Sequence, residues 1–193
     1  MAEPPARVSP ARNVEVKARV ADPAALRARV AALASVGSPP VTPVLIGQHD
    51  TFFNVARGRL KLRRLDDGTG QLIFYERDDT TGPKTSAYST SPCPDAAAME
   101  ALLARALGVR GVVDKRRELF MIGRTRVHLD DVRGLGHFLE LEVVLGESEP
   151  AADGEREAHD LLVKLAVPAS ALLAPAYIDL LDDPDLRVPA DGP

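Results

Sequence analysis

Charged and aliphatic residues alternate in several short stretches of the chain. The clearest is Arg59-Leu60-Lys61-Leu62-Arg63, in which every second residue is a cation. A period of two is typical of a β-strand, because successive side chains point to opposite faces. The three cations would share one face and span about 13 Å, at ~3.3 Å per residue. The same pattern recurs at residues 14–17, 113–117, 124–130 and 139–143.

Extending this pattern between turn residues predicts eight strands. Asp66-Asp67-Gly68 is typical of a hairpin turn. The links between successive strands are short, which favours an antiparallel meander over parallel βαβ units. Pro92 and Pro94 are expected to end the fifth strand. The strands are expected at about 12–20, 45–55, 59–66, 71–77, 84–90, 112–121, 125–132 and 137–145.

Segments with apolar residues at helical spacing interrupt the strands. Asp22 before Pro23 indicates a helix start, and Asp95 has the same place before a second helix. Gly37 and Gly108 are expected to end these two helices. An acidic stretch containing Gly and Pro, 147–157, is expected to be a linker before a third. The helices are expected at about 23–35, 96–107 and 155–166, and an apolar piece at 177–181 is expected to dock on the sheet.

The helices determine which side of the sheet is inside. They are rich in Ala and Leu, so each must bury one face. The aliphatic strand faces are the available surface, and covering them turns the charged faces inward. Eight strands can close into a barrel wide enough for a small ligand. The predicted fold class is therefore α+β: an eight-stranded antiparallel β-barrel flanked by helices, with a charged interior.

A charged interior is costly unless it holds water, ions and a charged ligand. The cations expected inside outnumber the carboxylates, although the whole chain carries a net charge of −4. The sequence therefore predicts an anionic ligand. The cations expected inside are Lys17, Arg59, Lys61, Arg63, Arg77, Lys84, Lys115, Arg117 and Arg126, and the carboxylates are Glu15, Asp130, Glu140 and Glu142.

The carboxylates suit a metal ion. Glu140 and Glu142 would lie about 6.6 Å apart on one strand face, and Glu15 could complete an oxygen cage. Mg²⁺ and Mn²⁺ favour carboxylate and phosphate oxygens. Cations that hold phosphate, and carboxylates that hold a metal bridging to it, are the groups phosphoryl chemistry requires. We therefore expect a polyphosphate site that uses Mg²⁺ or Mn²⁺.

The same side chains have simpler interpretations. The cationic face of 59–63 could be an exposed sheet face, although several strands of one pattern argue for an interior. Glu140 and Glu142 could only pair with the interior cations. Asp130 could be a metal ligand or could hydrogen-bond the turn at Gly134, and Arg77 could be a charge at the rim.

Four other residues leave alternatives open. His128 shares a strand face with Asp130, which suggests a general base, but a lone histidine is more often structural. Asp50 could orient a lysine or a nucleotide, or could simply pack. Tyr88 and Tyr177 are expected to be packing residues.

Composition excludes several classes of protein. A length of 193 residues suits one domain, and 45 % hydrophobic with 27 % charged residues is ordinary for a soluble protein. The negative net charge argues against a nucleic-acid partner. A single cysteine, Cys93, excludes an intramolecular disulfide and a cysteine-rich zinc module.

The expected organisation is one domain between two tails. Residues 1–11 are expected to be a disordered leader, 12–181 a single domain, and 182–193 a flexible tail. The N-terminus lacks the apolar core of a signal peptide. The most apolar late stretch, 161–178, is interrupted by Lys164 and two prolines, so we expect no membrane span and no membrane partner. The expected location is the cytoplasm, and a homodimer is left open.

Several motifs occur in an order shared with a known family. Asn13-Val14-Glu15-Val16-Lys17 resembles the N-terminal Glu-x-Glu-x-Lys signature of CYTH proteins, the triphosphate tunnel metalloenzymes. The resemblance covers roughly residues 12–146, and the ordered set is more specific than any one motif. The further motifs are Gln48-x-Asp50-Thr51-Phe52-Phe53, Gly58-Arg59-Leu60-Lys61-Leu62-Arg63, Lys84-x-Ser86-x-Tyr88, Val113-x-Lys115-x-Arg117, Arg126-x-His128-Leu129-Asp130 and Gly134-Leu135-Gly136-x-Phe138-Leu139-Glu140-Leu141-Glu142.

The resemblance implies an eight-stranded antiparallel tunnel domain that binds a triphosphate with Mg²⁺ or Mn²⁺. Such proteins include class IV adenylyl cyclases, thiamine triphosphatases and inorganic triphosphatases. The Gln-x-Asp-Thr and Leu-Asp-x-Val-x-Gly-Leu-Gly segments look most like the cyclase branch. One position departs from the signature: Asn13 stands where the first acid is expected, and its neutral amide is a weaker ligand. The number of metal ions is therefore left open.

The implied activity is the conversion of ATP to cyclic AMP and pyrophosphate. The alternatives are hydrolysis of tripolyphosphate, thiamine triphosphate or a nucleoside triphosphate, or binding of polyphosphate without catalysis. The implied roles are catalysis by Glu15, Lys17, Glu140 and Glu142, triphosphate binding by the nine cations listed above, and metal binding by Glu15, Asp130, Glu140 and Glu142.

Overall fold

The computed structural model describes residues 11–36 and 41–183. Most of the predicted leader and tail, and Gly37, therefore lie outside the described residues. The first strand already includes Ala11, which is paired with Tyr88, and the last helix extends to Asp182. The predicted tails include both residues, but in the structure one belongs to a strand and the other to a helix.

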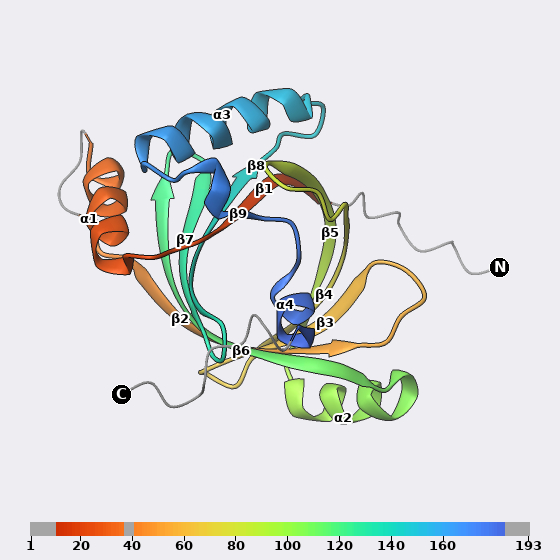
Figure 1. The fold of residues 1–193 in the computed structure, drawn as a ribbon. Helices are drawn as coiled ribbons and strands as arrows, with labels where there is room; N and C mark the ends of the chain where they lie inside the picture. Colours follow the sequence, from red (N-terminus) through yellow and green to blue (C-terminus); the bar gives the residue numbers. More distant parts are fainter. Residues whose placement is uncertain (1–10, 37–40, 184–193) are drawn as a thin grey trace.

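Eight antiparallel strands close into a barrel. Neighbours along the sheet follow the order β5-β4-β3-β2-β6-β7-β8-β1, and β1 pairs with β5 to close the ring (Figure 1). This confirms the predicted α+β fold class and its eight-stranded antiparallel barrel. The strands are β1 (Ala11–Arg19), β2 (Val44–Phe53), β3 (Arg59–Leu65), β4 (Gly70–Arg77), β5 (Lys84–Cys93), β6 (Val109–Ile122), β7 (Thr125–Val132) and β8 (Gly136–Val144).

A short ninth strand completes the sheet. It is β9 (Leu172–Leu173), which pairs with residues 17–18 of β1. The first strand therefore has two partners on one edge, β5 along residues 11–15 and β9 farther along. A 3₁₀ turn, η1 (Ala169–Ala171), leads into β9.

The described residues form four α-helices, and the first three pack on the outside of the barrel. Asp22 and Asp95 cap the first two, as predicted: their side chains accept hydrogen bonds from the backbone N–H groups of Ala25 (2.9 Å) and Ala98 (3.0 Å). No helix in the described parts of the chain has the length and apolar character needed to cross a membrane. The helices are α1 (Pro23–Ala34), α2 (Ala96–Leu107), α3 (Ala151–Lys164) and α4 (Tyr177–Asp182).

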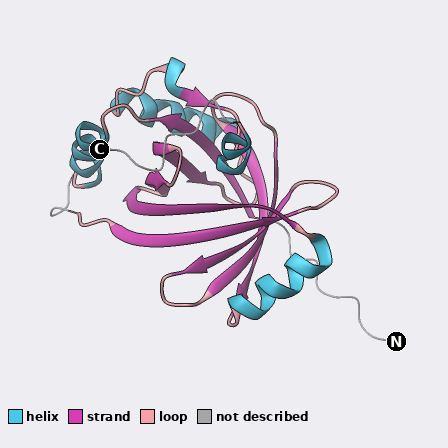
Figure 2. Ribbon diagram, turned by 60° about the horizontal axis from the view of Figure 1, so that its bottom comes forward, coloured by secondary structure: helices cyan, strands magenta, loops and turns pink. Residues whose placement is uncertain are grey.

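The helices cover the aliphatic faces of the strands. Val14, Val16 and Leu141 are buried in one cluster with residues of α1 and α3, such as Val30 and Leu161. A second outer cluster joins Leu62 of β3 to Ala96 and Met99 of α2. Figures 1 and 2 place α2 on the opposite side of the barrel from α1 and α3. The charged faces of the same strands are therefore turned toward the interior, as the sequence predicts.

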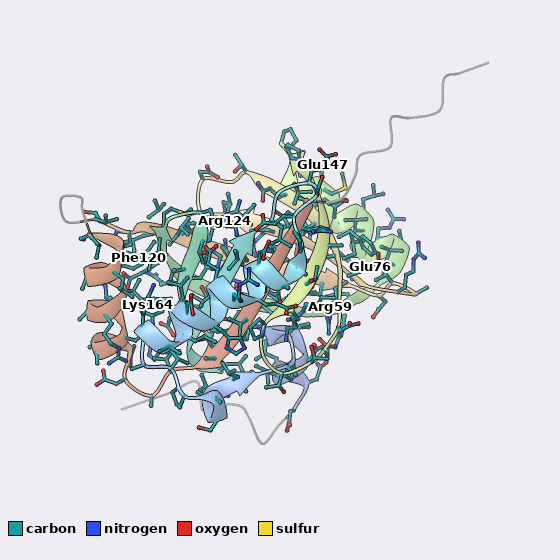
Figure 3. All side chains as sticks on the ribbon, turned by 90° about the horizontal axis from the view of Figure 1, so that it is seen from above. Arg59, Glu76, Phe120, Arg124, Glu147 and Lys164 are labelled. Atoms are coloured by element: carbon teal, nitrogen blue, oxygen red, sulfur yellow. The ribbon has the colours of Figure 1, made fainter. Side chains whose placement is uncertain are left out.

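The prediction of an acidic linker at 147–157 is wrong, because α3 begins at Ala151. Its glycine has a packing role: a Cβ on Gly154 would lie 2.8 Å from Leu145 Cδ2 and 2.9 Å from Val14 Cγ2. The glycine thus lets α3 approach β1 closely. Figure 3 shows the helix lying across the barrel, with Arg124 beside it, and the Nε of Arg124 donates to Glu157 Oε2 at 2.9 Å.

The expected strand end before Pro92 is also wrong. β5 continues to Cys93, and Pro92 lies opposite Gln71 of β4. β1 pairs with β5 only between Lys84 and Tyr88. Within the described residues, the other edge of β5 is therefore free at Pro92, and a proline is tolerated where its missing N–H would face no partner.

Candidate functional site

The barrel encloses a cavity of about 200 Å³. Every one of the eight barrel strands contributes side chains to its wall, and α4 contributes the residues at its start. Most of the charged residues predicted to lie inside are brought together here. Those that line the cavity are Glu15, Lys17, Lys61, Arg63, Arg77, Lys115, Arg117, Arg126, Glu140 and Glu142.

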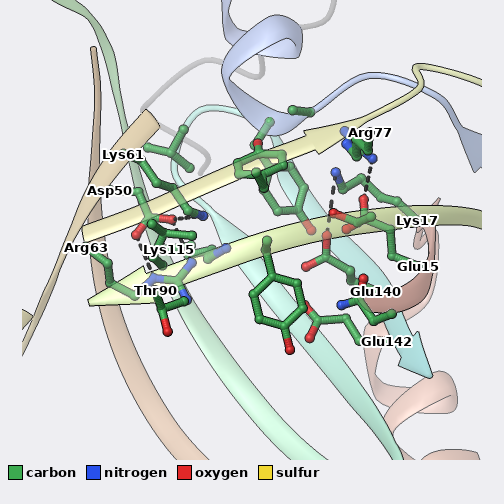
Figure 4. Close-up of a pocket in the computed structure, with 18 of the residues that line it drawn as sticks. Glu15, Lys17, Asp50, Lys61, Arg63, Arg77, Thr90, Lys115, Glu140 and Glu142 are labelled. Carbon is green, nitrogen blue, oxygen red and sulfur yellow. Dashed lines mark hydrogen bonds and ion pairs between the residues drawn. The ribbon is translucent and has the colours of Figure 1, made fainter. Parts of the chain in front are cut away.

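The charges form two groups at opposite ends of the cavity (Figure 4). We call them the cationic end, with Lys61, Arg63 and Lys115 around Asp50, and the acidic end, with Glu15, Glu140 and Glu142 beside Lys17 and Arg77. The residues at each end come from more than one strand, so only the closed barrel brings them together.

Asp50 is the centre of the cationic end. Its carboxylate accepts hydrogen bonds from Lys61 Nζ (2.8 Å), Arg63 Nε (2.7 Å) and an Arg63 terminal nitrogen (2.8 Å). Burial alone would raise the pKa of Asp50, but Arg63 and Lys61 hold it well below its ordinary value. One buried carboxylate thus compensates two cations.

Lys115 adds a further cation at this end. Burial, and next the charge of Arg117, lower the pKa of the Lys115 amine to about 7. Its Nζ lies 3.7 Å from Asp130 Oδ2 and 5.0 Å from the ring centre of Tyr177. An anion that approaches this amine would favour its protonated form, so Lys115 is suited to hold a phosphate oxygen.

At the acidic end, strand register brings the carboxylates together. Glu15 lies opposite Glu142 and Lys17 opposite Glu140 in the pairing of β1 with β8. Arg77 of β4 forms an ion pair with Glu15. Burial, and next the charge of Glu140, raise the pKa of Glu15. A carboxyl group with a raised pKa can accept a proton in a reaction.

Glu140 differs from Glu15 in its surroundings. Burial alone would raise its pKa, but Lys17, His128 and Arg117 hold it well below the ordinary value. The Nζ of Lys17 is 3.7 Å from Glu140 Oε1, and a terminal nitrogen of Arg117 donates to Glu140 Oε2 at 2.6 Å. Glu140 is therefore ionised and available as a ligand for a cation.

The acidic end contains a donor set that fits a divalent metal ion. Ligand atoms of His128, Glu140 and Glu142 all lie within 4.8 Å of one another. Two carboxylates and an imidazole suit a divalent ion of the first transition row, and the carboxylates suit Mg²⁺ as well. Glu15 is outside this cluster, and its metal role stays a prediction.

Arg59 and Lys84 do not line the cavity. Arg59 donates to Asp79 (2.6 Å) and Asp179 (2.8 Å). The amine of Lys84 donates to the backbone carbonyls of Thr80 and Ala174, both at 2.8 Å, and burial lowers its pKa to about 8. Both cations tie surrounding segments to the barrel, and their triphosphate roles stay predictions.

Asp130 lies behind the cavity wall. Arg117 donates to its two oxygens, each at 2.6 Å, and the hydroxyl of Tyr177 donates to Oδ2 at 3.0 Å. The side chain of Asp130 is fully buried. Its carboxylate therefore orients Arg117 in the structure, and its metal role stays a prediction.

Sequence reasoning did not find the part that Tyr177 plays. Its ring lies over the amine of Lys17, which is 4.1 Å from the ring centre, and packs edge-on against Phe138 at 5.0 Å between centres. α4, which begins at Tyr177, lies within the outline of the ring of strands in Figure 1. Tyr177 and Tyr88 both line the cavity, so describing them only as packing residues is incomplete. The apolar segment 177–181 predicted where this helix lies, but it did not predict the contact between Tyr177 and Lys17.

Comparisons with known proteins agree with this architecture. The sequence model of the CYTH domain family matches residues 11–177 of this chain. Adenylate cyclase CyaB of Aeromonas hydrophila is 25 % identical over 178 residues, which cover 88 % of this chain and 88 % of the relative.

Solved structures share the fold. The PH1012 protein of Pyrococcus horikoshii OT3 superposes with a TM-score of 0.75 at 20 % identity, over 86 % of this chain and 98 % of that one. A protein of Vibrio parahaemolyticus superposes with a TM-score of 0.71 at 16 % identity, over 91 % of this chain and 100 % of that one.

Proposed function

The chain belongs to the CYTH domain family, and from this premise we propose that it is a metal-dependent adenylyl cyclase that converts ATP to cyclic AMP and pyrophosphate. One observation carries the proposal: the same cavity of the barrel has cations at one end and, at the other, carboxylates whose positions suit a metal ion. The similarity to adenylate cyclase CyaB supports the choice of reaction.

The cations have a direct role in this reaction. Lys61, Arg63 and Lys115 would hold the oxygens of the triphosphate at the cationic end and neutralise the charge that leaves with pyrophosphate. They come from two strands, β3 and β6, and would therefore hold an extended polyanion from two sides. The cavity of about 200 Å³ is smaller than the pockets that enclose whole drug-sized ligands. We infer that it encloses the triphosphate and that the nucleoside lies toward one mouth.

The reaction itself needs a proton acceptor. The 3′-oxygen of the ribose attacks the α-phosphorus, the bond from this phosphorus to the oxygen that bridges to the β-phosphate breaks, and pyrophosphate leaves. Glu15, with its raised pKa, is the group to which we assign the proton of the 3′-hydroxyl. A divalent ion held by Glu140 and Glu142 would supply charge neutralisation at the phosphate oxygens.

Product analysis tests the reaction. The purified protein, given ATP with Mg²⁺ or Mn²⁺, is expected to release cyclic AMP and pyrophosphate with little inorganic phosphate. Tripolyphosphate and thiamine triphosphate, offered in parallel, test hydrolysis. Phosphate release without cyclic AMP would make the protein a triphosphatase, and tight tripolyphosphate binding without turnover at any metal concentration would make it a binding module. Either result would refute the cyclase.

Lys61→Ala separates binding from folding. Loss of this amine removes a charge-assisted hydrogen bond to phosphate, and we expect tripolyphosphate to bind about 10–100-fold more weakly by calorimetry. Asp50 keeps its bonds to Arg63, so the circular dichroism spectrum should not change. Lys164→Ala, at the exposed end of α3, is the matched control and should bind as the unmodified protein does. If Lys61→Ala unfolds, Lys61 has a structural role instead.

A further inference from the structure

His128 is a buried histidine whose surroundings do not explain its position by hydrogen bonding. It lies on β7, opposite Glu140 of β8, and its side chain is 4 % exposed. Its Nδ1 is 3.7 Å from Glu140 Oε2 and 3.7 Å from Glu142 Oε1. Among the described residues, no acceptor lies within hydrogen-bond distance of this buried nitrogen, although its proximity to Glu140 helps to lower the pKa of that carboxyl group.

These distances are longer than a direct hydrogen bond, although they are within the range of an ion pair. A histidine that donates to a carboxylate lies about 2.7–3.2 Å from one oxygen. His128 is instead equally far from two carboxylates. Ligands about 2.1 Å from one shared ion in octahedral geometry lie about 3.0 Å apart when adjacent and about 4.2 Å apart when opposite. The 3.7 Å separations lie between these two values, so a shared ion needs only a small shift of the side chains.

We propose that Nδ1 of His128 is a nitrogen ligand of the divalent ion that Glu140 and Glu142 hold. The presence of this ion is taken from the proposed function. The inference adds a third protein ligand, which binds through nitrogen and not through oxygen. Nearby cations share these carboxylates: Arg117 donates to Glu140 Oε2, the oxygen that faces His128, whereas Arg126 donates to Glu142 Oε2 and leaves the Oε1 that faces His128. A nitrogen donor on the neighbouring strand completes a three-sided site.

The nature of the donor determines which ion the site prefers. Mg²⁺ takes oxygen ligands almost exclusively and gives up its water reluctantly. Imidazole binds divalent ions of the first transition row, including Mn²⁺, whose affinity for a mixed nitrogen and oxygen site exceeds that of Mg²⁺. The site should therefore favour Mn²⁺ over Mg²⁺.

Electron paramagnetic resonance of Mn²⁺ bound to the full chain tests the ligand directly. We expect the spin-echo modulation of a directly bonded ¹⁴N nucleus, both with Mn²⁺ alone and with added tripolyphosphate. The modulation should disappear in His128→Gln. It should persist in His137→Gln, the matched control, because His137 is half-exposed and pairs with Asp131. Affinity for Mn²⁺ should fall about 10–100-fold in His128→Gln, while affinity for Mg²⁺ changes much less.

Labelling keeps the test decisive if His128→Gln does not fold. Protein carrying ¹⁵N-histidine and no other change should show the modulation of ¹⁵N in place of ¹⁴N. Bound Mn²⁺ without nitrogen modulation would refute the histidine ligand and leave the proposed metal-dependent function intact. Modulation that survives His128→Gln would refute it in the same way. Failure to bind Mn²⁺ under either condition would overturn both proposals.

Discussion

Arg117→Met is expected to lower the free energy of unfolding by about 3–5 kcal/mol, the usual cost of breaking a buried ion pair. Arg117 donates to both oxygens of Asp130 and to Glu140, each at 2.6 Å. Methionine fills similar space but leaves two buried carboxylates without their main partner. Lys115, 3.7 Å from Asp130, offsets part of this cost, because loss of the Arg117 charge removes one of the causes that lower the pKa of the amine. Urea denaturation measures the loss.

A second arginine provides the control. Arg126 also lines the cavity, but its side chain is 41 % exposed and lies 3.4 Å from Glu142. Arg126→Met should therefore cost less than about 1 kcal/mol, as exposed pairs do. Combining Arg117→Met with Asp130→Asn should destabilise by less than the sum of the two, because the double variant removes one of the stranded charges. Equal losses for the two arginine variants would show that Arg117 is not a structural partner.

The arginine pair shows what the sequence can and cannot predict. Alternation on β6 and β7 identifies Arg117 and Arg126 as interior residues, because a period of two fixes the face on which a side chain lies. The alternation does not indicate how deep in the barrel each side chain lies. Depth depends on strand stagger and on α4, whose tyrosine donates to Asp130 across 47 positions of the chain. Binding and structural cations therefore look alike in the sequence.

The local sequence was misleading where packing overrode the usual preference of a residue. Gly154 and its acidic neighbours are typical of a linker, yet the missing side chain is what lets α3 contact Val14 and Leu145. Pro92 is tolerated in β5 because only one edge of the strand is paired there within the described chain. In both cases the deciding contact is with a distant segment, which residue propensities do not contain.

Charge pairs within the barrel balance part of the charge at each end of the cavity. Each end of the cavity contains opposite charges. Asp50 lies among the cations, and the carboxylates of the acidic end are paired with Lys17, Arg77, Arg117 and Arg126. These pairs reduce the cost of burying like charges. They also mean that a ligand must compete with, or join, the pairs already formed. Removing one internal counter-charge should therefore change stability and affinity in opposite directions.

Asp50→Asn tests this balance most strongly. The amide keeps the shape of the side chain but leaves Lys61 and Arg63 without their carboxylate, so we expect unfolding to become easier by about 3–5 kcal/mol. Tripolyphosphate should bind about tenfold or more tightly, because one negative charge beside the anion is gone. Ligand at about 100 times its dissociation constant should restore about 2.7 kcal/mol. Thermal unfolding with and without tripolyphosphate, together with calorimetry, measures all three effects.

Asp114→Asn is the matched control, because Asp114 lies on the outside of the barrel and is hydrogen-bonded at 2.5 Å to His49. It should change tripolyphosphate affinity little. The alternative role for Asp50, direct orientation of the substrate, predicts the opposite sign, since loss of an orienting carboxylate would weaken binding. Weaker tripolyphosphate binding by Asp50→Asn would therefore refute compensation as its role. Tighter binding with lower stability would mean that Asp50 neutralises the cations in the free protein. The same cations would then be available to bind an anion of higher charge.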